Sequence, residues 1–251
     1  QNKTGRQVPG KIPGTYRPES SLIKLSNFKG SLHAHLLPTN FPLDLGALVE
    51  PVSVAAQAVM ASRVSPGDDV LIQGAGPIGL FTALIAQISG AHHVIINDMS
   101  EERLDLANEL GVQYPIHADS QKSLAHAIST ITENQGVDVA FDCAGVQPTL
   151  TGAIQGAIQA LKNGGKVTVI ALFQHPPVVD VRALLKKGGS LLTSYGYANI
   201  FDRVIKIIDT HRSLFKRVIT KKIELNELVS EGTESLEKDK KQAKILVRLH
   251  S

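Results

Sequence analysis

The chain has 251 residues, of which 43% are apolar, so it is long enough to bury the core of one large or two small domains. Its net charge of +3 comes from residues 1–20, which hold four basic residues against one acidic residue, and the remainder is neutral. This distribution argues against an extended basic surface, and we expect no nucleic-acid partner.

The sequence also bears on the compartment. The longest apolar helical pattern, at 78–88, is too short to cross a bilayer, so we expect no membrane partner. The polar N-terminal segment does not resemble a secretory signal. The single cysteine, Cys143, excludes an internal disulfide and a four-thiolate zinc site. We therefore expect a cytoplasmic protein.

The N-terminal part of the chain has weak patterns. Residues 1–21 contain three prolines and three glycines without apolar periodicity, which predicts an irregular tail. Alternating apolar residues predict short strands at 22–25 and 32–37. A helix is expected from about Leu45 to Ser62.

From Asp69 onward, apolar strands alternate with helical patterns, which is typical of a parallel sheet with right-handed crossovers. Strands are expected at 69–73, 93–98, 114–117, 137–142, 166–172 and 190–195. Helices are expected at 77–89, 101–110, 120–134, 148–161, about 181–187 and 199–211. Ser100 is the expected N-cap of the second of these helices, and Gly164 and Gly165 the end of the fourth. The sequence therefore predicts a doubly wound, six-stranded parallel sheet of the Rossmann type, with sites at the carboxyl ends of the strands.

The last part of the chain changes character. Its patterns predict a strand at 218–223, a helix at 225–236 and a strand at 244–249. Together with the strands expected before residue 38, these pieces predict a reduced second domain of β segments from both chain ends. The expected organisation is an irregular tail at 1–21, a reduced domain from 22–61 and 212–251, and a dinucleotide-binding domain at 62–211.

A glycine-rich motif, Gly74–Gly79, lies between the first expected strand and the helix that follows it. Its first glycine permits a tight turn, Gly76 lets the backbone approach a pyrophosphate, and the last glycine allows close contact of helix and strand. The diphosphate would bind the free N–H groups at the start of the helix. Asp98 ends the next strand, where its carboxylate can accept hydrogen bonds from both ribose hydroxyls and would repel a 2′-phosphate. The motif predicts NAD as the cofactor, held by Gly74, Gly76, Pro77, Ile78, Gly79 and Asp98.

Several short motifs, each ordinary alone, are specific when they are taken together: Leu48–Val54, Pro66–Asp68, Gly74–Gly79, Phe141–Gly145, Gly164–Lys166 and Ala243–Arg248. Through them the chain resembles the medium-chain, zinc-type alcohol dehydrogenase family. Within that family it is most similar to the polyol and 2,3-butanediol dehydrogenase branch. The similarity extends from about Gly30 to Arg248.

The resemblance implies a two-domain enzyme that moves hydride between NAD and a secondary alcohol or ketone, with zinc polarising the oxygen. Glu50 matches the family's glutamate that lies beside or on this zinc. Family members carry a much longer catalytic segment before it, with the zinc-binding Cys and His, whereas 49 residues without a cysteine precede Glu50 here. One carboxylate cannot hold a catalytic zinc, which takes about three protein ligands. His33 and His35 could join it, but we interpret them as structural and expect no metal site.

The remaining candidates surround the expected nicotinamide. Leu172 and Phe173 follow the fifth strand, and Ala144 and Gly145 follow the fourth; we expect all four to contact the cofactor. Arg103, three residues into the second helix, has two alternatives, a contact with adenine or an ion pair on the helix surface.

Several polar side chains near the expected nicotinamide could take part in catalysis. His175 follows the fifth strand and could relay protons, or it is a plain surface histidine. Tyr195 and Tyr197 end the sixth strand, where either could touch a substrate or serve only in side-chain contacts. Cys143 is interpreted as a small core hydrophobe and not as a nucleophile. The candidate catalytic residues are His175, Tyr195 and Glu50.

Three hypotheses follow for the function. The first is an NAD(H)-binding oxidoreductase that acts on a secondary alcohol or ketone without the usual zinc site, as a homodimer formed through the edge strand at 191–194. The second is a non-redox protein on the same fold, either a pseudoenzyme or a biosynthetic catalyst that binds an apolar ligand in the former cleft. The third is a piece of a longer chain whose missing part carries the chemistry.

Overall fold

The structure, a computed structural model, describes residues 35–117, 121–144, 150–173 and 175–249. The expected tail at 1–21, the strand at 22–25 and most of the strand at 32–37 lie outside the described residues, as do His33 and Gly145. Residues 35–37, which are described, do not form a strand. The expected domain built from both chain ends therefore stays a prediction.

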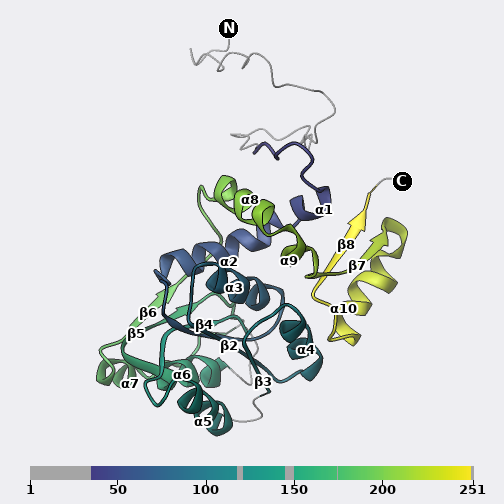
Figure 1. Ribbon diagram of the computed structural model, residues 1–251. Coiled ribbons are helices and arrows are strands. Elements are labelled where there is room, and N and C mark those ends of the chain that lie inside the picture. The colour runs from purple at the N-terminus through teal and green to yellow at the C-terminus, as the bar shows by residue number, and fades with distance from the viewer. Residues whose placement is uncertain (1–34, 118–120, 145–149, 174, 250–251) are drawn as a thin grey trace, which may run out of the picture.

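A six-stranded parallel sheet forms the centre of the molecule (Figure 1). Its strand order is β3-β2-β1-β4-β5-β6, so the chain winds outward from β1 in one direction and then from β4 in the other. This order confirms the predicted doubly wound fold. The strands are β1 (Asp69–Gln73), β2 (His93–Asp98), β3 (Tyr114–His117), β4 (Val137–Asp142), β5 (Leu161–Val169) and β6 (Ser190–Thr193).

Helices cover both faces of this sheet (Figure 1). One hydrophobic core lies on the side of the sheet covered by a first group of helices, and a second core lies on the opposite face. The first group consists of α2 (Val49–Ala61), α3 (Pro77–Ile88) and α4 (Glu101–Glu109), and α8 (Phe201–Thr210) packs on α2. The second group consists of α5 (Gln121–Ile131), α6 (Leu150–Ala160) and α7 (Val181–Lys186).

The central elements show how burial determines the sequence pattern. Residues 70–72 of β1 are all fully buried, because a central parallel strand is covered on both faces and its apolar residues need not alternate. The helix α3 is buried from Gly79 to Ala86, so it is apolar on every side. The outer helix α4 is more polar and begins at Ser100, whose hydroxyl accepts a hydrogen bond from the Arg103 amide at 3.3 Å. This contact confirms the predicted N-cap.

The structure differs from the expected elements near both ends of the sheet. The helix expected at 45–62 forms as α1 (Leu43–Gly46) and α2, because the ring of Pro51 would clash with the carbonyl of Ala47 in a continuous helix. The strand β5 begins at Leu161 and not at residue 166, so Gly164 lies within a strand, with φ +79°. The register of β4 against β5 shifts where these extra residues are inserted.

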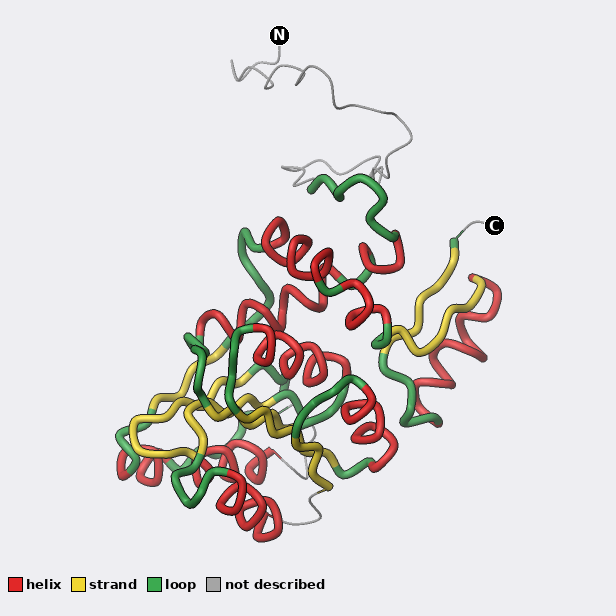
Figure 2. The backbone as a smooth tube through the Cα atoms, viewed as in Figure 1, coloured by secondary structure: helices red, strands yellow, loops and turns green. Residues whose placement is uncertain are grey.

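The C-terminal segment forms a small lobe at one side of the main sheet (Figure 2). After α9 (Arg212–Lys216), the strands β7 (Ile219–Glu224) and β8 (Lys244–Arg248) pair in parallel, which confirms both expected strands. The helix expected between them is instead three short pieces, η2 (Leu225–Glu227), the π-helical η3 (Leu228–Thr233) and α10 (Glu234–Lys238). The interruption includes the buried Gly232, a residue that weakens regular helix.

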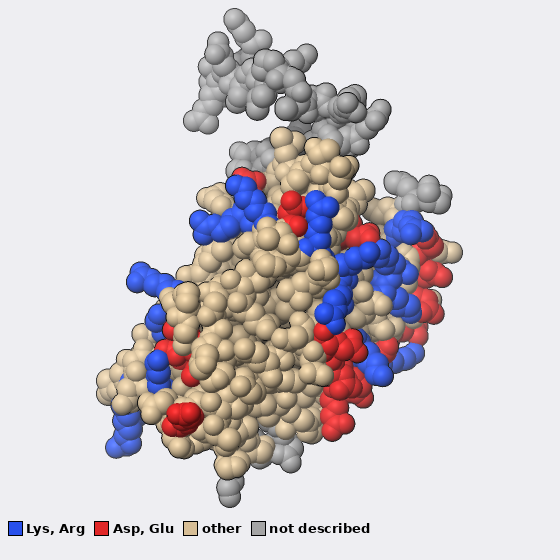
Figure 3. All heavy atoms as spheres, viewed as in Figure 1, with Lys and Arg blue, Asp and Glu red and all other residues tan. Residues whose placement is uncertain are grey.

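The surface bears on possible partners. On the face shown in Figure 3, basic and acidic side chains of the described residues are interspersed over the C-terminal lobe and do not form a continuous basic band. None of the helices in the described part of the chain combines the length and the apolar character that crossing a membrane requires. The absence of nucleic-acid and membrane partners stays a prediction.

A row of polar side chains, each with a buried oxygen atom, crosses the carboxyl end of the sheet. Gln73 in β1 is aligned with Asn97 in β2 and with Asp142 in β4. One side-chain oxygen of each has no hydrogen-bond partner among the described residues. The other carboxylate oxygen of Asp142 accepts a hydrogen bond from the Ala144 amide at 3.1 Å. Burial raises the pKa of Asp142 above its ordinary value, and the bond from Ala144 offsets only part of this shift.

A raised pKa means that the folded protein binds the proton more tightly than the unfolded chain does. The cost of ionising Asp142 is therefore absent below its ordinary pKa of 3.8 and fully present above its pKa in the folded state. Asp142→Asn should raise the free energy of unfolding at pH 7, and this gain should shrink toward pH 4. Urea denaturation at both values measures it, with Asp105→Asn on the exposed side of α4 as the control. A lower stability of Asp142→Asn at pH 7 would contradict this account.

Candidate active site

The Gly74–Gly79 loop has the geometry of a phosphate cradle. Gly74 adopts φ +97°, a conformation that favours glycine. A Cβ on Gly79 would lie 1.8 Å from the Gly74 carbonyl oxygen, so only glycine allows α3 to approach β1 this closely. A Cβ on Gly76 would meet no protein atom within 4 Å, so the space in front of this residue is open.

The same loop begins α3. Gly76 is the N-cap, no side chain caps the helix, and Pro77 occupies its first turn. The first amides of a helix lack partners within the helix, and the helix dipole makes this end positive. The loop and helix start therefore fit a diphosphate group.

Asp98 lies beside this loop, at the end of β2. Its Oδ2 accepts a hydrogen bond from the Ala75 amide at 2.8 Å, and its Oδ1 accepts one from the Ser100 amide at 2.9 Å. Arg103 Nη1 lies 3.5 Å from Oδ2, which is the ion-pair alternative for this arginine. A carboxylate offers about four acceptor sites, so Asp98 keeps capacity for a ribose hydroxyl next to the phosphate cradle.

A cavity of about 810 Å³ adjoins the start of α3. Its walls come from α2, from the start of α3, and from the segments that follow β4, β5 and β6. These are the carboxyl ends of neighbouring parallel strands, where ligands bind in sheets of this kind. The cavity is lined by Glu50, Val54, Ile78, Cys143, Ile170, Ala171, Leu172, Ser194, Tyr195, Gly196 and Tyr197.

Glu50 and Tyr197 line this cavity together, and their side chains interact. The pKa of Tyr197 is raised, first by burial and then by the negative charge and hydrogen bond of Glu50. The Tyr197 ring stacks on Phe201 with centroids 4.8 Å apart, and Phe201 contacts the His35 ring at 5.0 Å. His35 in turn lies 2.8 Å from the Asp202 carboxylate. Contacts with α8 thus hold the phenol in position, and His35 belongs to this group of packed side chains.

The other predicted catalytic residues occupy different positions. Tyr195 lines the same cavity, but its side chain is 86% exposed. His175 is exposed and lines a neighbouring cavity of about 540 Å³, together with Phe173. Leu172 lines both cavities. Tyr195 also lines both, so it shares the larger cavity with Glu50 and the smaller one with His175.

Cys143 lies on the wall of the larger cavity. Its thiol lies 3.9 Å from the Thr82 hydroxyl, and burial raises its pKa to about 12. A thiol with this pKa is protonated at neutral pH and is a poor nucleophile. This supports the interpretation of Cys143 as a small core residue. The next residue, Ala144, closely approaches Gly74 and so lies beside the phosphate cradle.

Comparisons with known proteins identify the family. The model of a family described as zinc-binding dehydrogenase matches residues 77–210, more than half of the chain. The chain belongs to the zinc-binding, medium-chain alcohol dehydrogenase family. Within it, the similarities lie in the branch of butanediol and polyol dehydrogenases.

The (R,R)-butanediol dehydrogenase of Neisseria gonorrhoeae is 34% identical over 202 residues, which are 80% of this chain and 56% of that protein. The crystal structure of 2R,3R-butanediol dehydrogenase from Bacillus subtilis is 31% identical, with a TM-score of 0.78, over 86% of this chain and 61% of that one. This member of the zinc-binding dehydrogenases therefore spans somewhat more than half the length of these relatives.

Two further dehydrogenase structures share the fold and hold nicotinamide cofactors. An Escherichia coli alcohol dehydrogenase was solved with NADH, and it is 23% identical, with a TM-score of 0.76, over 86% of this chain and 62% of its own. A putative zinc-binding dehydrogenase from Sinorhizobium meliloti was solved with NADP, and it is 23% identical, with a TM-score of 0.73, over the same shares. These two proteins of the same fold thus hold nicotinamide cofactors, one as NADH and the other as NADP.

The described residues do not fit a catalytic zinc at the large cavity. Glu50 and Cys143 are the two residues of ligand type among the described residues in its wall. A catalytic zinc takes about three protein ligands. The three residues of ligand type that do lie together in the described part of the chain, Asp69, His92 and His93, are at the other end of β1 and β2.

The two glycines provide a matched test of the cradle. Gly76→Ala should fold with stability changed by less than about 0.5 kcal/mol, because its Cβ points into open space, and should weaken NADH binding at least about tenfold. Gly79→Ala should lose about 1–3 kcal/mol of stability, because its Cβ would clash with the Gly74 carbonyl. Urea denaturation and calorimetric titration measure the two effects. Full NADH affinity in Gly76→Ala would show that the diphosphate binds elsewhere.

Proposed function

We propose that this protein transfers hydride between NAD and a secondary alcohol or ketone, as an alcohol or polyol dehydrogenase. The observation that carries the proposal is the continuity between the uncapped start of α3 and the cavity that contains the Glu50–Tyr197 pair. The described residues give no ligand set for zinc there, so we assign the chemistry to this chain's own side chains.

The cofactor preference rests on Asp98. Two backbone amides already hold its carboxylate beside the glycine loop. A ribose with two free hydroxyls can donate hydrogen bonds to it, whereas a 2′-phosphate would meet like charge. Arg103 is close to the same carboxylate, but it is already paired with Asp98. This arrangement favours NAD over NADP.

When bound, NAD supplies the hydride acceptor, and NADH the hydride donor. Ile78 and Leu172 provide apolar surface in the cavity, and Ala144 lies at its phosphate end. Such surface excludes water and favours one orientation of the reactants, which lowers the barrier by positioning.

The Glu50–Tyr197 pair supplies the proton that ketone reduction requires in addition to hydride. The Tyr197 phenol is protonated at neutral pH, since its pKa lies above the ordinary value of 10, and it can donate this proton to the oxygen that becomes the alcohol. Glu50 is exposed to solvent and can help return a proton from water to the phenol. In the reverse direction, the phenol oxygen takes the proton of the alcohol as the phenol passes its own proton to the Glu50 carboxylate, which releases it to water.

The proposal is tested first by titration with NADH and by assay of ketone reduction. Asp98→Ala should weaken NADH binding about tenfold or more, because two ribose hydrogen bonds of about 1 kcal/mol each are lost. Asp105→Ala, an exposed carboxylate on α4, is the matched control and should bind NADH normally. Unchanged affinity in Asp98→Ala would mean that the adenosine site is misplaced. NADH binding without turnover would favour the non-redox alternative, and the absence of both would refute the proposal.

The catalytic pair is tested by removing one hydroxyl at a time. Tyr197→Phe should lower kcat for ketone reduction at least about a hundredfold with little change in NADH affinity, because it removes the proton donor. Tyr195→Phe, which alters the neighbouring exposed phenol, should have the smaller effect. Steady-state kinetics and NADH titration of both variants distinguish these outcomes. A larger loss in Tyr195→Phe would transfer the role to the tyrosine that the sequence favoured.

We further propose that two copies pair through β6. This strand is the free edge of the six-stranded sheet, and the Leu191 side chain on it is 38% exposed. The unpaired backbone groups of an edge strand favour pairing with another strand. A monomer mass in light scattering would contradict the homodimer. The cytoplasmic location stays a prediction.

A further inference from the structure

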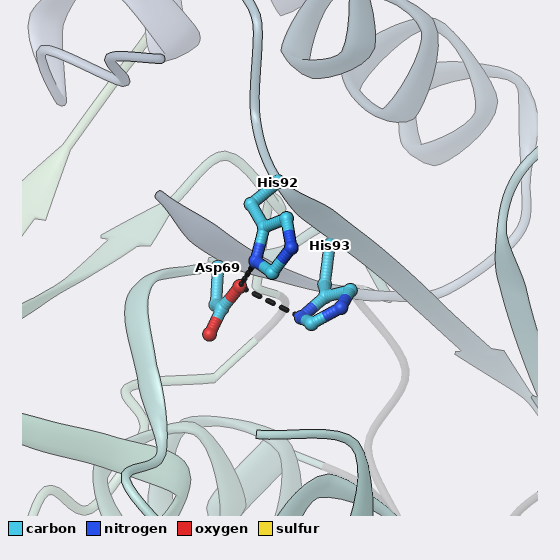
Figure 4. A group of neighbouring side chains, drawn as sticks. All are labelled: Asp69, His92 and His93. Carbon is cyan, nitrogen blue, oxygen red and sulfur yellow. Dashed lines mark ion pairs between the residues drawn. The ribbon is translucent and has the colours of Figure 1, made fainter. Parts of the chain in front are cut away.

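A second cluster of chemically active side chains lies at the amino ends of β1 and β2, at the opposite end of these strands from the glycine loop. Asp69 begins β1, His93 begins β2, and His92 immediately precedes it. Figure 4 shows that both imidazole rings turn the same nitrogen, Nδ1, toward one carboxylate oxygen of Asp69. The nucleotide cradle and the large cavity do not include these residues.

The distances in this cluster are those of metal ligands. Asp69 Oδ1 lies 3.3 Å from His92 Nδ1 and 2.9 Å from His93 Nδ1, and the three ligand atoms all lie within 4.8 Å of one another. Tetrahedral zinc with bonds of about 2.0–2.1 Å separates its ligand atoms by about 3.3 Å. The three atoms could therefore surround an ion with only small side-chain movements.

The buried atoms of the cluster lack other partners. Asp69 Oδ1 and His93 Nδ1 are both shielded from solvent, and neither has a hydrogen-bond partner among the described residues, although they lie 2.9 Å apart. The two atoms are thus close enough for a hydrogen bond, but the angles at this contact are not those of a hydrogen bond. Buried polar atoms are nearly always satisfied, and a shared cation would satisfy both.

Surrounding residues hold the ligands in place. The Asp69 amide donates a hydrogen bond to Asp138 Oδ2 at 3.0 Å, and Asp138 forms an ion pair with Lys162. The His93 ring makes an edge contact with Tyr114, with centroids 5.3 Å apart. Of the three side chains, that of His92 is the most exposed to solvent, at 62%. An ion can therefore enter from the His92 side, where water can complete its coordination.

We propose that Asp69, His92 and His93 bind one divalent transition-metal ion, with zinc as the expected ion. Two imidazoles and a carboxylate suit zinc, and also copper and nickel, better than magnesium or calcium, which prefer oxygen ligands. The ion joins the start of β1 to the start of β2 and so acts as a structural clasp. This site is separate from the proposed hydride-transfer site, and the evidence for it does not depend on the proposed function.

The test is equilibrium dialysis of the whole chain, first freed of metal by a chelator, against zinc chloride. The expected result is one zinc per chain and a higher Tm, because an ion that binds only the native state stabilises it. His92→Gln should weaken zinc binding at least about tenfold and abolish the rise in Tm. Because His92 is exposed, this variant should fold normally, which circular dichroism checks. Asp69→Asn should also lose binding, since it removes the buried charge.

His126→Gln, on the exposed side of α5, is the matched control and should bind zinc like the wild type. Retention of one tightly bound zinc in both His92→Gln and Asp69→Asn would overturn the proposal, because the ion would then have other ligands. A wild type that binds zinc no more tightly than His92→Gln would also overturn it, and any zinc detected would be adventitious surface binding.

Discussion

The close contact between β1 and the start of α3 is the constraint on which the rest of the site depends. With glycine at position 79, the helix can lie against the Gly74 carbonyl, where any side chain would collide. This approach directs the first amides of α3 toward the carboxyl edge of the sheet, next to Asp98 and the open space at Gly76. The positive helix end, the acidic ribose position and the neighbouring cavity thus follow from one backbone contact.

The elements around this contact were predictable because their signals are local. An apolar strand, a glycine turn and an apolar helix are adjacent in the chain. The start of α4 is equally local, because the Ser100 hydroxyl accepts a hydrogen bond from the amide of Arg103, three residues later. The pieces that were predicted wrongly depend on context. The break between α1 and α2 depends on a clash of Pro51, and the early start of β5 depends on its alignment with β4.

The chemistry of the site was only partly predictable. Glu50 and Tyr197 are far apart in the sequence, and the proposed choice of Tyr197 over Tyr195 rests on its contact with Phe201, which the sequence alone does not reveal. The cluster of Asp69 with His92 and His93 was missed for the same reason, since it requires two strands to be aligned at their first residues. A pair of adjacent histidines at a strand start was the available signal, and it has no meaning until the partner strand is known.

The row of Gln73, Asn97 and Asp142 has a consequence for folding. Side chains alternate between the two faces of a strand, so a slip of β4 by one residue would move Asp142 to the opposite face. There it would enter the aliphatic layer beneath α2 and α3. A misaligned sheet would therefore bury a carboxyl group among hydrocarbon side chains, which costs free energy. The row thus favours the native alignment of the strands over alignments shifted by one residue.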